Sequence, residues 1–375
     1  MSQITCDVIV VGAGIAGASV AAELATDRKV VLLERESQPG YHTTGRSAAL
    51  FSEIYGSAAI RALSRASRAF LTNPPTGFAQ APLLAPRGSL FIAREDQLSQ
   101  LEAFAQSPDI AGATQPVFAE QAIRLSPILR ADYVAAAVFE PDAADMDVHG
   151  LLMGYLRLFR AAGGALHTES EVLGAAASPQ GWRIETRQGQ FSAPIVVNAA
   201  GAWADELACL AGVTAVGVEP RRRTAITIDG PAGLDLSETP MPIDIDEQFY
   251  FKPESGRVLL SPADETPSEA CDVQPDEWDI AVAVDRLEAA TTLQVRRVHA
   301  KWAGLRTFAP DKNPVVGFQA QAPGFFWLAG QGGYGIQTAP AMARLAAALI
   351  RGQTAPQDIQ DEGLALAEIA PDRFA

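Results

Sequence analysis

The most constraining feature of this chain is a glycine motif near its start. Gly12, Gly14 and Gly17 directly follow an apolar run, residues 7–11, and open an alanine-rich stretch, residues 16–25. An apolar strand, a glycine turn and a helix in this order predict a βαβ unit whose strands are buried in a parallel sheet. The first glycine permits the tight turn, the second lets the backbone approach a pyrophosphate, and the third allows the helix to pack on the strand.

An acidic residue completes the motif. Glu34 ends the next apolar run, residues 30–33, and lies 22 residues beyond Gly12. An acid at this place hydrogen-bonds the ribose hydroxyls of a dinucleotide. The pyrophosphate would lie on the backbone of Ile15 and Ala16, because a helix N-terminus presents unpaired N–H groups to an anion. Together these residues predict a dinucleotide site.

A second glycine cluster lies near the other end of the sequence, between an apolar run and a helical pattern. It comprises Gly330, Gly332, Gly333 and Gly335. A nicotinamide enzyme has no need of a second close backbone approach, whereas an extended flavin is held at its adenine end and at its isoalloxazine end. FAD is therefore the better fit, and a purely structural turn is the alternative.

The polar loop after the second strand supplies further donors where a flavin would pass. Its candidate cofactor contacts are Thr43, Thr44, Gly45, Arg46, Ser47 and Ala48. We expect the remaining cofactor contacts to come from Arg35, Val172, Gly201, Tyr334, Ile336 and Gln337.

Composition excludes several classes of function. The 29 basic and 44 acidic residues give a formal charge of −15, which disfavours any general affinity for nucleic acid or anionic lipid. The three cysteines, Cys6, Cys209 and Cys271, have no zinc-ligand or disulfide spacing, so we expect no metal and a reducing, cytoplasmic location. The most apolar helical stretch, residues 339–350, is far shorter than the roughly 20 residues that span a bilayer, and we expect no transmembrane segment.

The chain has 375 residues, enough for two domains. The pattern of apolar strands and helices at both ends, with alternating apolar and polar residues between 219 and 301, predicts an α/β fold. We expect a Rossmann-like FAD-binding domain with an inserted α+β substrate domain that carries a mixed, largely antiparallel sheet. The predicted FAD-binding domain comprises residues 1–50, 145–218 and 307–375, and the substrate domain comprises residues 51–144 and 219–306.

These segments together resemble the FAD-dependent D-amino-acid oxidase family, which includes D-amino-acid dehydrogenases, glycine oxidase and sarcosine oxidase. The strings YHTTGRSAA, EPRRRTA, QFYFKPES, WAGLRTFAPDKNPVVG and GQGGYGIQTAP are most similar to those of a D-arginine dehydrogenase. The resemblance spans nearly the whole chain and implies noncovalent FAD and oxidation of a carbon that bears an amine. The segment GLRTFAPDKNPVVG contains no cysteine, so the covalent flavin link of sarcosine oxidases is not expected.

The resemblance also implies substrate roles for four residues. Arg223 and Arg306 would bind the substrate carboxylate, Tyr250 would add a phenol hydrogen bond to it, and Tyr55 would lie over the substrate. A planar guanidinium and a hydroxyl suit a carboxylate in an apolar pocket. The strand register leaves open whether Arg222 or Arg223 faces the site.

Two departures from the family pattern bear on specificity. Ser89 stands where D-arginine dehydrogenases carry an acidic residue, and Leu50 stands at their active-site histidine. A cationic substrate tail would be desolvated there without a partner, at a cost of several kcal/mol. We therefore expect an apolar or neutral D-amino acid, with Leu50, Phe51 and Ser89 in the substrate pocket and Leu90 as another candidate wall residue.

The sequence thus predicts an enzyme: an FAD-dependent D-amino-acid dehydrogenase or oxidase that releases a 2-oxo acid and ammonia. The alternatives are a flavoenzyme for a secondary amine, such as an N-methyl amino acid or proline, or for a 2-hydroxy acid, and a flavin-binding electron carrier without turnover. The electron acceptor, which could be a quinone, an electron-transfer protein or oxygen, is left open by the sequence.

Overall fold

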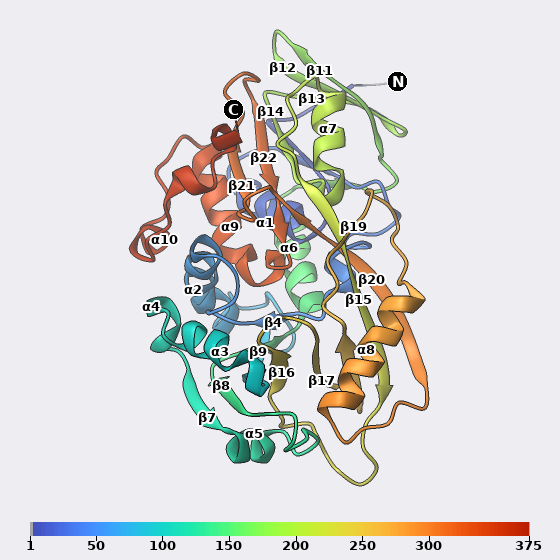
Figure 1. The fold of residues 1–375 in the computed structure, drawn as a ribbon. Helices are drawn as coiled ribbons and strands as arrows, with labels where there is room; N and C mark the ends of the chain where they lie inside the picture. Colours follow the sequence, from blue (N-terminus) through green and yellow to red (C-terminus); the bar gives the residue numbers. More distant parts are fainter. Residues whose placement is uncertain (1–2, 375) are drawn as a thin grey trace.

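A computed structural model describes residues 3–374 and contains two large sheets (Figure 1). The first has six strands in the order β10 (Ala165–His167), β3 (Val30–Leu33), β2 (Val8–Val11), β14 (Ile195–Asn198), β22 (Phe325–Ala329) and β21 (Val315–Phe318). All neighbouring strands are parallel except β21, which is antiparallel to β22. The apolar runs at the start of the sequence are thus central strands, buried along their whole length.

Both faces of this sheet are covered. Helices α1 (Ile15–Leu24), α6 (Val148–Ala161) and α9 (Gly335–Ile350) pack together on one face, and α2 (Ala58–Thr72) packs on α9. On the other face lie α7 (Ala204–Leu210) and a four-stranded sheet, in the order β1 (Gln3–Thr5), β13 (Gly189–Ala193), β12 (Gly181–Thr186) and β11 (Val172–Ser178). Burial on both faces explains why the strands are continuously apolar.

The second large sheet has ten strands and is largely antiparallel. Its path is β23 (Gln331–Gly332), β20 (Val298–Phe308), β15 (Glu219–Asp229), β18 (Arg257–Ser261), β17 (Tyr250–Glu254), β16 (Met241–Asp244), β6 (Ser89–Ala93), β8 (Ala136–Glu140) and β7 (Gln115–Phe118), with β19 (Thr266–Pro267) paired to β15. Only β16 and β6 are parallel, so the predicted mixed sheet and α/β fold class are confirmed.

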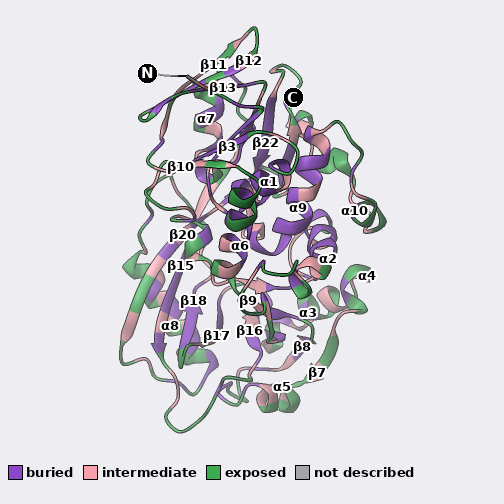
Figure 2. Cartoon of the chain, turned by 180° about the vertical axis from the view of Figure 1, so that it is seen from behind, coloured by how far each residue is buried: buried purple, intermediate pink, exposed green. Residues whose placement is uncertain are grey.

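One face of the ten-stranded sheet is packed, and the other is turned toward the site except along β6 and β8, where the helix over residues 98–105 covers it. Helices α8 (Glu277–Ala290) and α5 (Ala119–Leu125) cover the packed face, where Ile226 of β15 and Leu260 of β18 are fully buried. Figure 2 shows β17 and β18 largely in the purple of buried residues. Shorter elements complete the fold: β4 (Leu50–Phe51), β9 (Ala144–Met146), β5 (Leu84–Pro86), α3 (Leu98–Ala105), α4 (Pro108–Ala111) and α10 (Gln357–Asp361).

The six-stranded sheet draws its strands from residues 8–33, 165–198 and 315–329, and the ten-stranded sheet from residues 89–140, 219–308 and 331–332. Helix α2 lies in the segment predicted for the substrate domain, but its apolar face packs in the core around the six-stranded sheet. The domain boundaries themselves stay a prediction. None of the helices within residues 3–374 is both long and apolar enough to cross a membrane.

The tight turn before α1 generates a prediction about stability. A Cβ atom at Gly17 would lie 1.8 Å from the carbonyl oxygen of Gly12, so a side chain there would push α1 off the sheet. Gly17→Ala should lower the free energy of unfolding by about 1–3 kcal/mol, the usual effect of overpacking a core. The midpoint of thermal unfolding should fall accordingly. Gly112→Ala, where an added Cβ meets no atom within 4 Å, is the control. Equal midpoints for the two variants would contradict the packing role of Gly17.

Candidate active site

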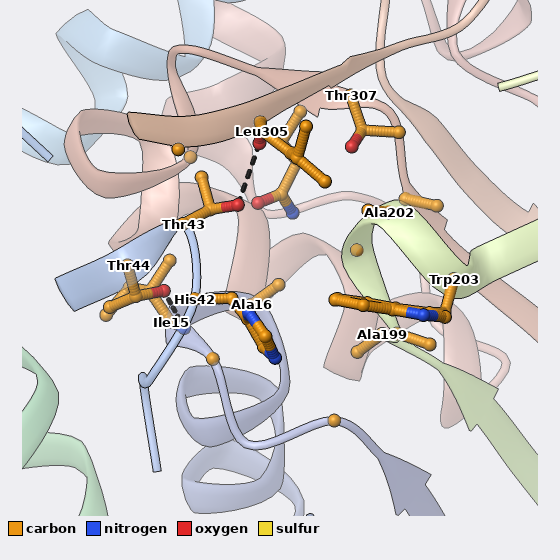
Figure 3. A pocket seen from close by; sticks show the side chains of 18 of the residues that line it. Ile15, Ala16, His42, Thr43, Thr44, Ala199, Ala202, Trp203, Leu305 and Thr307 are labelled. Carbon is orange, nitrogen blue, oxygen red and sulfur yellow. Dashed lines mark hydrogen bonds between the residues drawn. The ribbon is translucent and has the colours of Figure 1, made fainter. Parts of the chain in front are cut away.

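A cavity of about 320 Å³ runs between the two large sheets. Its walls come from segments that are far apart in the sequence: the turn before α1, the loop 40–48, residues 199–210, β20 and the C-terminal glycines. Figure 3 shows Thr43 and Thr44 on one side of this space and Trp203 on the other. A second cavity of about 70 Å³ adjoins it, because Arg223, Tyr250 and Arg306 line both.

The N-terminal turn requires glycine for two different reasons. Gly12 has a φ of +101°, and a Cβ there would lie 2.4 Å from the carbonyl oxygen of Ala199. At Gly14 a Cβ would lie 3.2 Å from Thr44 Oγ1, which accepts a 3.0 Å hydrogen bond from the N–H of Ile15 (Figure 3). Glycine at positions 12 and 14 thus keeps side chains away from the backbone that borders the cavity, as contact with a pyrophosphate requires, while the N–H of Ile15 is already bonded to Thr44.

Glu34 lies at the end of β3, lines the cavity and is 7% exposed. Its two oxygens accept 2.9 Å hydrogen bonds from the N–H groups of Ala13 and Glu36. Burial raises the pKa of this carboxyl, although the two N–H donors oppose the shift. The carboxyl is thus held rigidly beside the glycine turn, where a ribose hydroxyl would reach it.

Trp203 forms a part of the cavity wall that the sequence analysis did not predict. The ring of Trp203 lies 4.6 Å from the ring of His42, and the guanidinium of Arg35 lies 4.8 Å from its centre. All three residues line the cavity. The only local signal was the position of Trp203 in the small-residue string that follows a buried strand.

The loop after β3 is fixed by hydrogen bonds to the second sheet. Thr43 Oγ1 donates to the carbonyl oxygen of Leu305 at 2.7 Å (Figure 3). Arg46 donates to the carbonyl oxygens of Ala303 and Val273 at 3.1 Å and forms an ion pair with Asp272. Its guanidinium therefore already has protein partners, so we expect Arg46 to hold the loop in place as well as to border the cofactor.

Two buried polar atoms in the cavity wall lack a hydrogen-bond partner among residues 3–374. They are Thr307 Oγ1 and Gln331 Nε2, at the junction of β20 and β23. An unpaired buried polar group is costly, and a flavin ring edge carries complementary carbonyl and N–H groups. With the glycine turns and Glu34, these atoms make the cavity a good fit for FAD. The three cysteines line neither cavity, and noncovalent binding of FAD stays a prediction.

The C-terminal glycines allow a guanidinium to lie against the backbone. A Cβ at Gly333 would lie 2.6 Å from Arg306 Cζ, and a Cβ at Gly332, whose φ is +53°, would lie 2.3 Å from the ring of Phe308. The C-terminal glycines thus also shape the smaller cavity, because a side chain at Gly333 would collide with Arg306.

Arg306 lines both cavities. Its Nη1 donates a 3.1 Å hydrogen bond to the hydroxyl of Tyr55, and among residues 3–374 no carboxylate lies within 4.0 Å of it. Burial alone raises the pKa of Tyr250, but the nearby guanidiniums of Arg306 and Arg223 outweigh it and lower this pKa below its ordinary value. Two guanidiniums therefore act on Tyr250 at this end of the cavity, and one of them, Arg223, is paired with Glu265.

Strand alternation places the neighbouring arginines on opposite faces of β15. Arg223 is 7% exposed and lines both cavities, whereas Arg222 lies on the other face and bonds Asp279 of α8 at 2.7 Å. This geometry answers the register question in favour of Arg223. The substrate roles expected for Arg223, Arg306, Tyr250 and Tyr55 stay predictions.

Most of the predicted cofactor contacts line the larger cavity, and four do not. Gly17 packs on the backbone of Gly12, and Gly45 packs on Gly40, so each serves a turn. Tyr334 turns its ring toward Tyr55, at 4.9 Å, and Gln337 lines only the smaller cavity. The others, Gly12, Gly14, Ile15, Ala16, Glu34, Arg35, Thr43, Thr44, Arg46, Ser47, Ala48, Val172, Gly201, Gly330, Gly332, Gly333, Gly335 and Ile336, all lie in the wall.

Of the predicted substrate-pocket residues only Leu50 lines the smaller cavity. Phe51 is its neighbour on the two-residue strand β4, faces the opposite side and is fully buried under Arg68. Along β6, Leu90 faces the α8 side and Phe91 lines the cavity. The remaining wall residues, which the sequence analysis missed, include Glu247, Met241 and Ile243.

Ser89 does not line the cavity but belongs to a buried network behind it. Ser89 and Ser52 each donate a 2.8 Å hydrogen bond to Glu140 Oε2, and the N–H of Glu53 donates to Oε1 at 3.1 Å. Gln337 bonds the backbone of Ser52 and so ties the network to α9. The sequence analysis expected Ser89 at the place of an acid of D-arginine dehydrogenases, and in the structure its hydroxyl is bonded to the carboxylate of Glu140.

Comparison with known proteins establishes the class. A family model described as FAD dependent oxidoreductase, DAO, matches residues 7–349. The chain belongs to this family, and FAD is its cofactor. The resemblance stated above is thus confirmed at the level of the family, while the narrower likeness to D-arginine dehydrogenase stays a prediction.

The individual relatives share about a quarter of their residues with this chain. The chain is 26% identical over 366 residues to glycine oxidase of Geobacillus kaustophilus (strain HTA426). The matched region covers 93% of this chain and 94% of that protein. It is 26% identical over 328 residues to mitochondrial dimethylglycine dehydrogenase of Mus musculus, covering 76% of this chain and 37% of that protein. The structure of L-proline dehydrogenase from P. horikoshii superposes with a TM-score of 0.85 at 22% identity, covering 100% of this chain and 98% of that chain, which shows the shared fold.

The Glu140 network generates a prediction about pH. Burial raises the pKa of Glu140 above 4.5, although Ser89, Ser52 and the N–H of Glu53 oppose the shift. The folded protein therefore holds this proton more tightly than the unfolded chain does, and the resulting stability is full below pH 4.5 and lost as the pH rises through the folded pKa. Glu140→Gln cannot titrate, so the difference in thermal midpoint between wild type and variant should fall with rising pH. A difference in midpoint that stays constant with pH would contradict the buried, raised-pKa role of Glu140. Glu269→Gln, at an exposed position, controls for the lost charge.

Proposed function

We propose that this protein oxidises the carbon–nitrogen bond of a small amino acid, with a secondary amine such as an N-methyl amino acid or proline, or glycine itself, as the substrate class. The observation that carries the proposal is Arg306, a guanidinium deep in the protein that lines a small cavity and has no carboxylate partner among the described residues. A buried charge is normally paired, because an unpaired one costs several kcal/mol. A substrate carboxylate would supply the missing partner.

The size and lining of the smaller cavity support a small substrate. Its volume of about 70 Å³ holds about five water-sized groups, at 10–15 Å³ each. Leu50, Phe91, Met241, Ile243 and Ile336 form an apolar wall around the alkyl part of the substrate. A long cationic side chain would not fit this space.

The names of the relatives support the same substrate class. Glycine oxidase, dimethylglycine dehydrogenase and L-proline dehydrogenase are named for small amino acids, and two of these carry an N-alkyl substituent. This favours the secondary-amine alternative over the D-amino acid that the sequence analysis put first. Dehydrogenase or oxidase behaviour depends on the electron acceptor, which the proposal leaves unassigned.

The chain's own residues would bind and orient the substrate. Arg306 and Tyr250 hold the carboxylate, Tyr55 covers the substrate and the apolar wall excludes water from the amine. FAD, when bound, supplies the two-electron oxidation by taking a hydride equivalent from the carbon beside the amine. Fixing that carbon in one orientation provides much of the rate enhancement, and the geometry requires no strong base.

A panel of amino acids tests the proposed function. The FAD-loaded enzyme is mixed anaerobically with sarcosine, L-proline, D-proline, glycine, D-alanine, L-alanine and D-lactate, and bleaching of the flavin is followed by absorbance. Bleaching by sarcosine, proline or glycine ahead of D-alanine supports the proposal. Faster bleaching by D-alanine with release of ammonia restores the D-amino-acid interpretation, D-lactate alone indicates a hydroxy acid, and no bleaching at full FAD occupancy indicates an electron carrier.

Removing the unpaired guanidinium should abolish most carboxylate affinity. Arg306→Met should raise the dissociation constant for the substrate about 100-fold or more, because a charge-assisted bidentate contact is lost. Arg222→Met, which removes an adjacent charge on the far face of β15, should change it about twofold at most. The measurement is a titration of the flavin spectrum with 2-furoate, a small carboxylate. An unchanged constant in Arg306→Met would remove Arg306 from the binding site.

A further inference from the structure

We propose that Glu265 restricts the active site to substrates with a single carboxylate, by pairing with the second guanidinium of the cavity. This inference rests on the proposed function, since it assumes that Arg306 binds a substrate carboxylate. Glu265 itself lines neither cavity and lies behind Arg223, so it acts on specificity through Arg223.

The two cavity arginines differ in their partners. Arg223 Nη2 lies 3.1 Å from Glu265 Oε1, and its Nε donates a 2.8 Å hydrogen bond to the carbonyl oxygen of Asp264. Arg306 has only the phenol of Tyr55 as a hydrogen-bond partner within residues 3–374. Glu265 thus neutralises one of two guanidiniums and leaves the other free.

The register of the sheet shows that the two guanidiniums could otherwise act together. Arg223 pairs with Gly304 across β15 and β20, and Arg306 lies two residues further along β20. Directly paired residues of an antiparallel ladder share a face, and so do residues two apart, which makes these arginines diagonal neighbours. Two free guanidiniums in this arrangement would suit a substrate with two carboxylates.

Glu265 is fixed in position by its own backbone. The adjoining strand β19 pairs with β15, with Thr266 opposite Arg222 and Pro267 opposite Arg221. The preceding residue, Asp264, accepts a 2.6 Å hydrogen bond from the N–H of Thr224. The carboxylate therefore cannot leave Arg223 by a simple movement of its loop.

The second oxygen of Glu265 accepts a hydrogen bond from Lys312, 3.2 Å away. The side chain of Glu265 is 27% exposed and that of Lys312 is 57% exposed, so the ion pair extends from the cavity wall to the surface. A second substrate carboxylate would have to displace Glu265 from Arg223. The two carboxylates would then lie close together, and like charges at short range repel. Glu247, which lines the smaller cavity, adds a negative charge that would also repel a second substrate carboxylate.

The test compares two ether probes that differ by one carboxylate, methoxyacetate and oxydiacetate. Both are titrated into the FAD-loaded enzyme at constant ionic strength, and dissociation constants are taken from the flavin spectrum. Wild type should bind methoxyacetate about tenfold more tightly than oxydiacetate. Glu265→Gln should strengthen oxydiacetate binding about tenfold while methoxyacetate binding changes about twofold at most, a shift equivalent to 1.4 kcal/mol.

The control variant is Glu269→Gln, which removes the same charge from an exposed position four residues away and should leave the ratio of the two constants as in wild type. A Glu265→Gln enzyme that keeps FAD and the wild-type ratio overturns the inference, and so does a wild type that prefers oxydiacetate. Glu265→Ala serves as the second variant, and the wild-type ratio is a test that needs no substitution. Failure of methoxyacetate, oxydiacetate and 2-furoate alike to perturb the flavin would instead overturn the proposed function.

Discussion

A guanidinium without an anion is the constraint around which the substrate side of this structure is arranged. Arg306 keeps its charge deep in the protein, where an unpaired ion is costly. A carboxylate that enters the cavity would offset this cost by pairing with the guanidinium. The absence of a side chain at Gly333 leaves room for Arg306. A residue with a side chain at that position would force Arg306 away from the cavity. The C-terminal glycines therefore line the larger cavity and also leave room for Arg306 at the smaller one.

The long strands β15 and β20 connect this constraint to the cofactor. They run from the region of the six-stranded sheet into the ten-stranded sheet, as Figure 1 shows. One end of β20 carries Arg306 and Thr307 and meets the strand β23 beside the glycine loop. The same strand accepts hydrogen bonds from Thr43 and Arg46 of the loop after β3. A single strand, β20, thus carries Arg306 and also holds the loop that borders the larger cavity.

The sequence predicted the parts of this arrangement that depend on local pattern. Gly12, Gly14 and Glu34 identified the βαβ unit because a fixed spacing there has a fixed geometry. The sequence analysis was wrong where a shift of one residue along a strand decides whether a side chain faces the cavity. Phe51 and Leu90 were placed one residue out of register, because in a strand each step of one residue turns the side chain to the opposite face.

Contacts between distant segments were beyond any local pattern. Trp203 reaches the cavity only after β14 is inserted beside β2, and Ser89 meets Glu140 only across the pair of β6 and β8. Glu265 reaches Arg223 because β19 folds back on β15. In this protein the local motifs mark the cofactor cavity, whereas ion pairs between distant segments surround the smaller cavity. On the role proposed for Glu265, substrate choice in this chain depends on a carboxylate that lies outside the cavity wall and that no local motif marks.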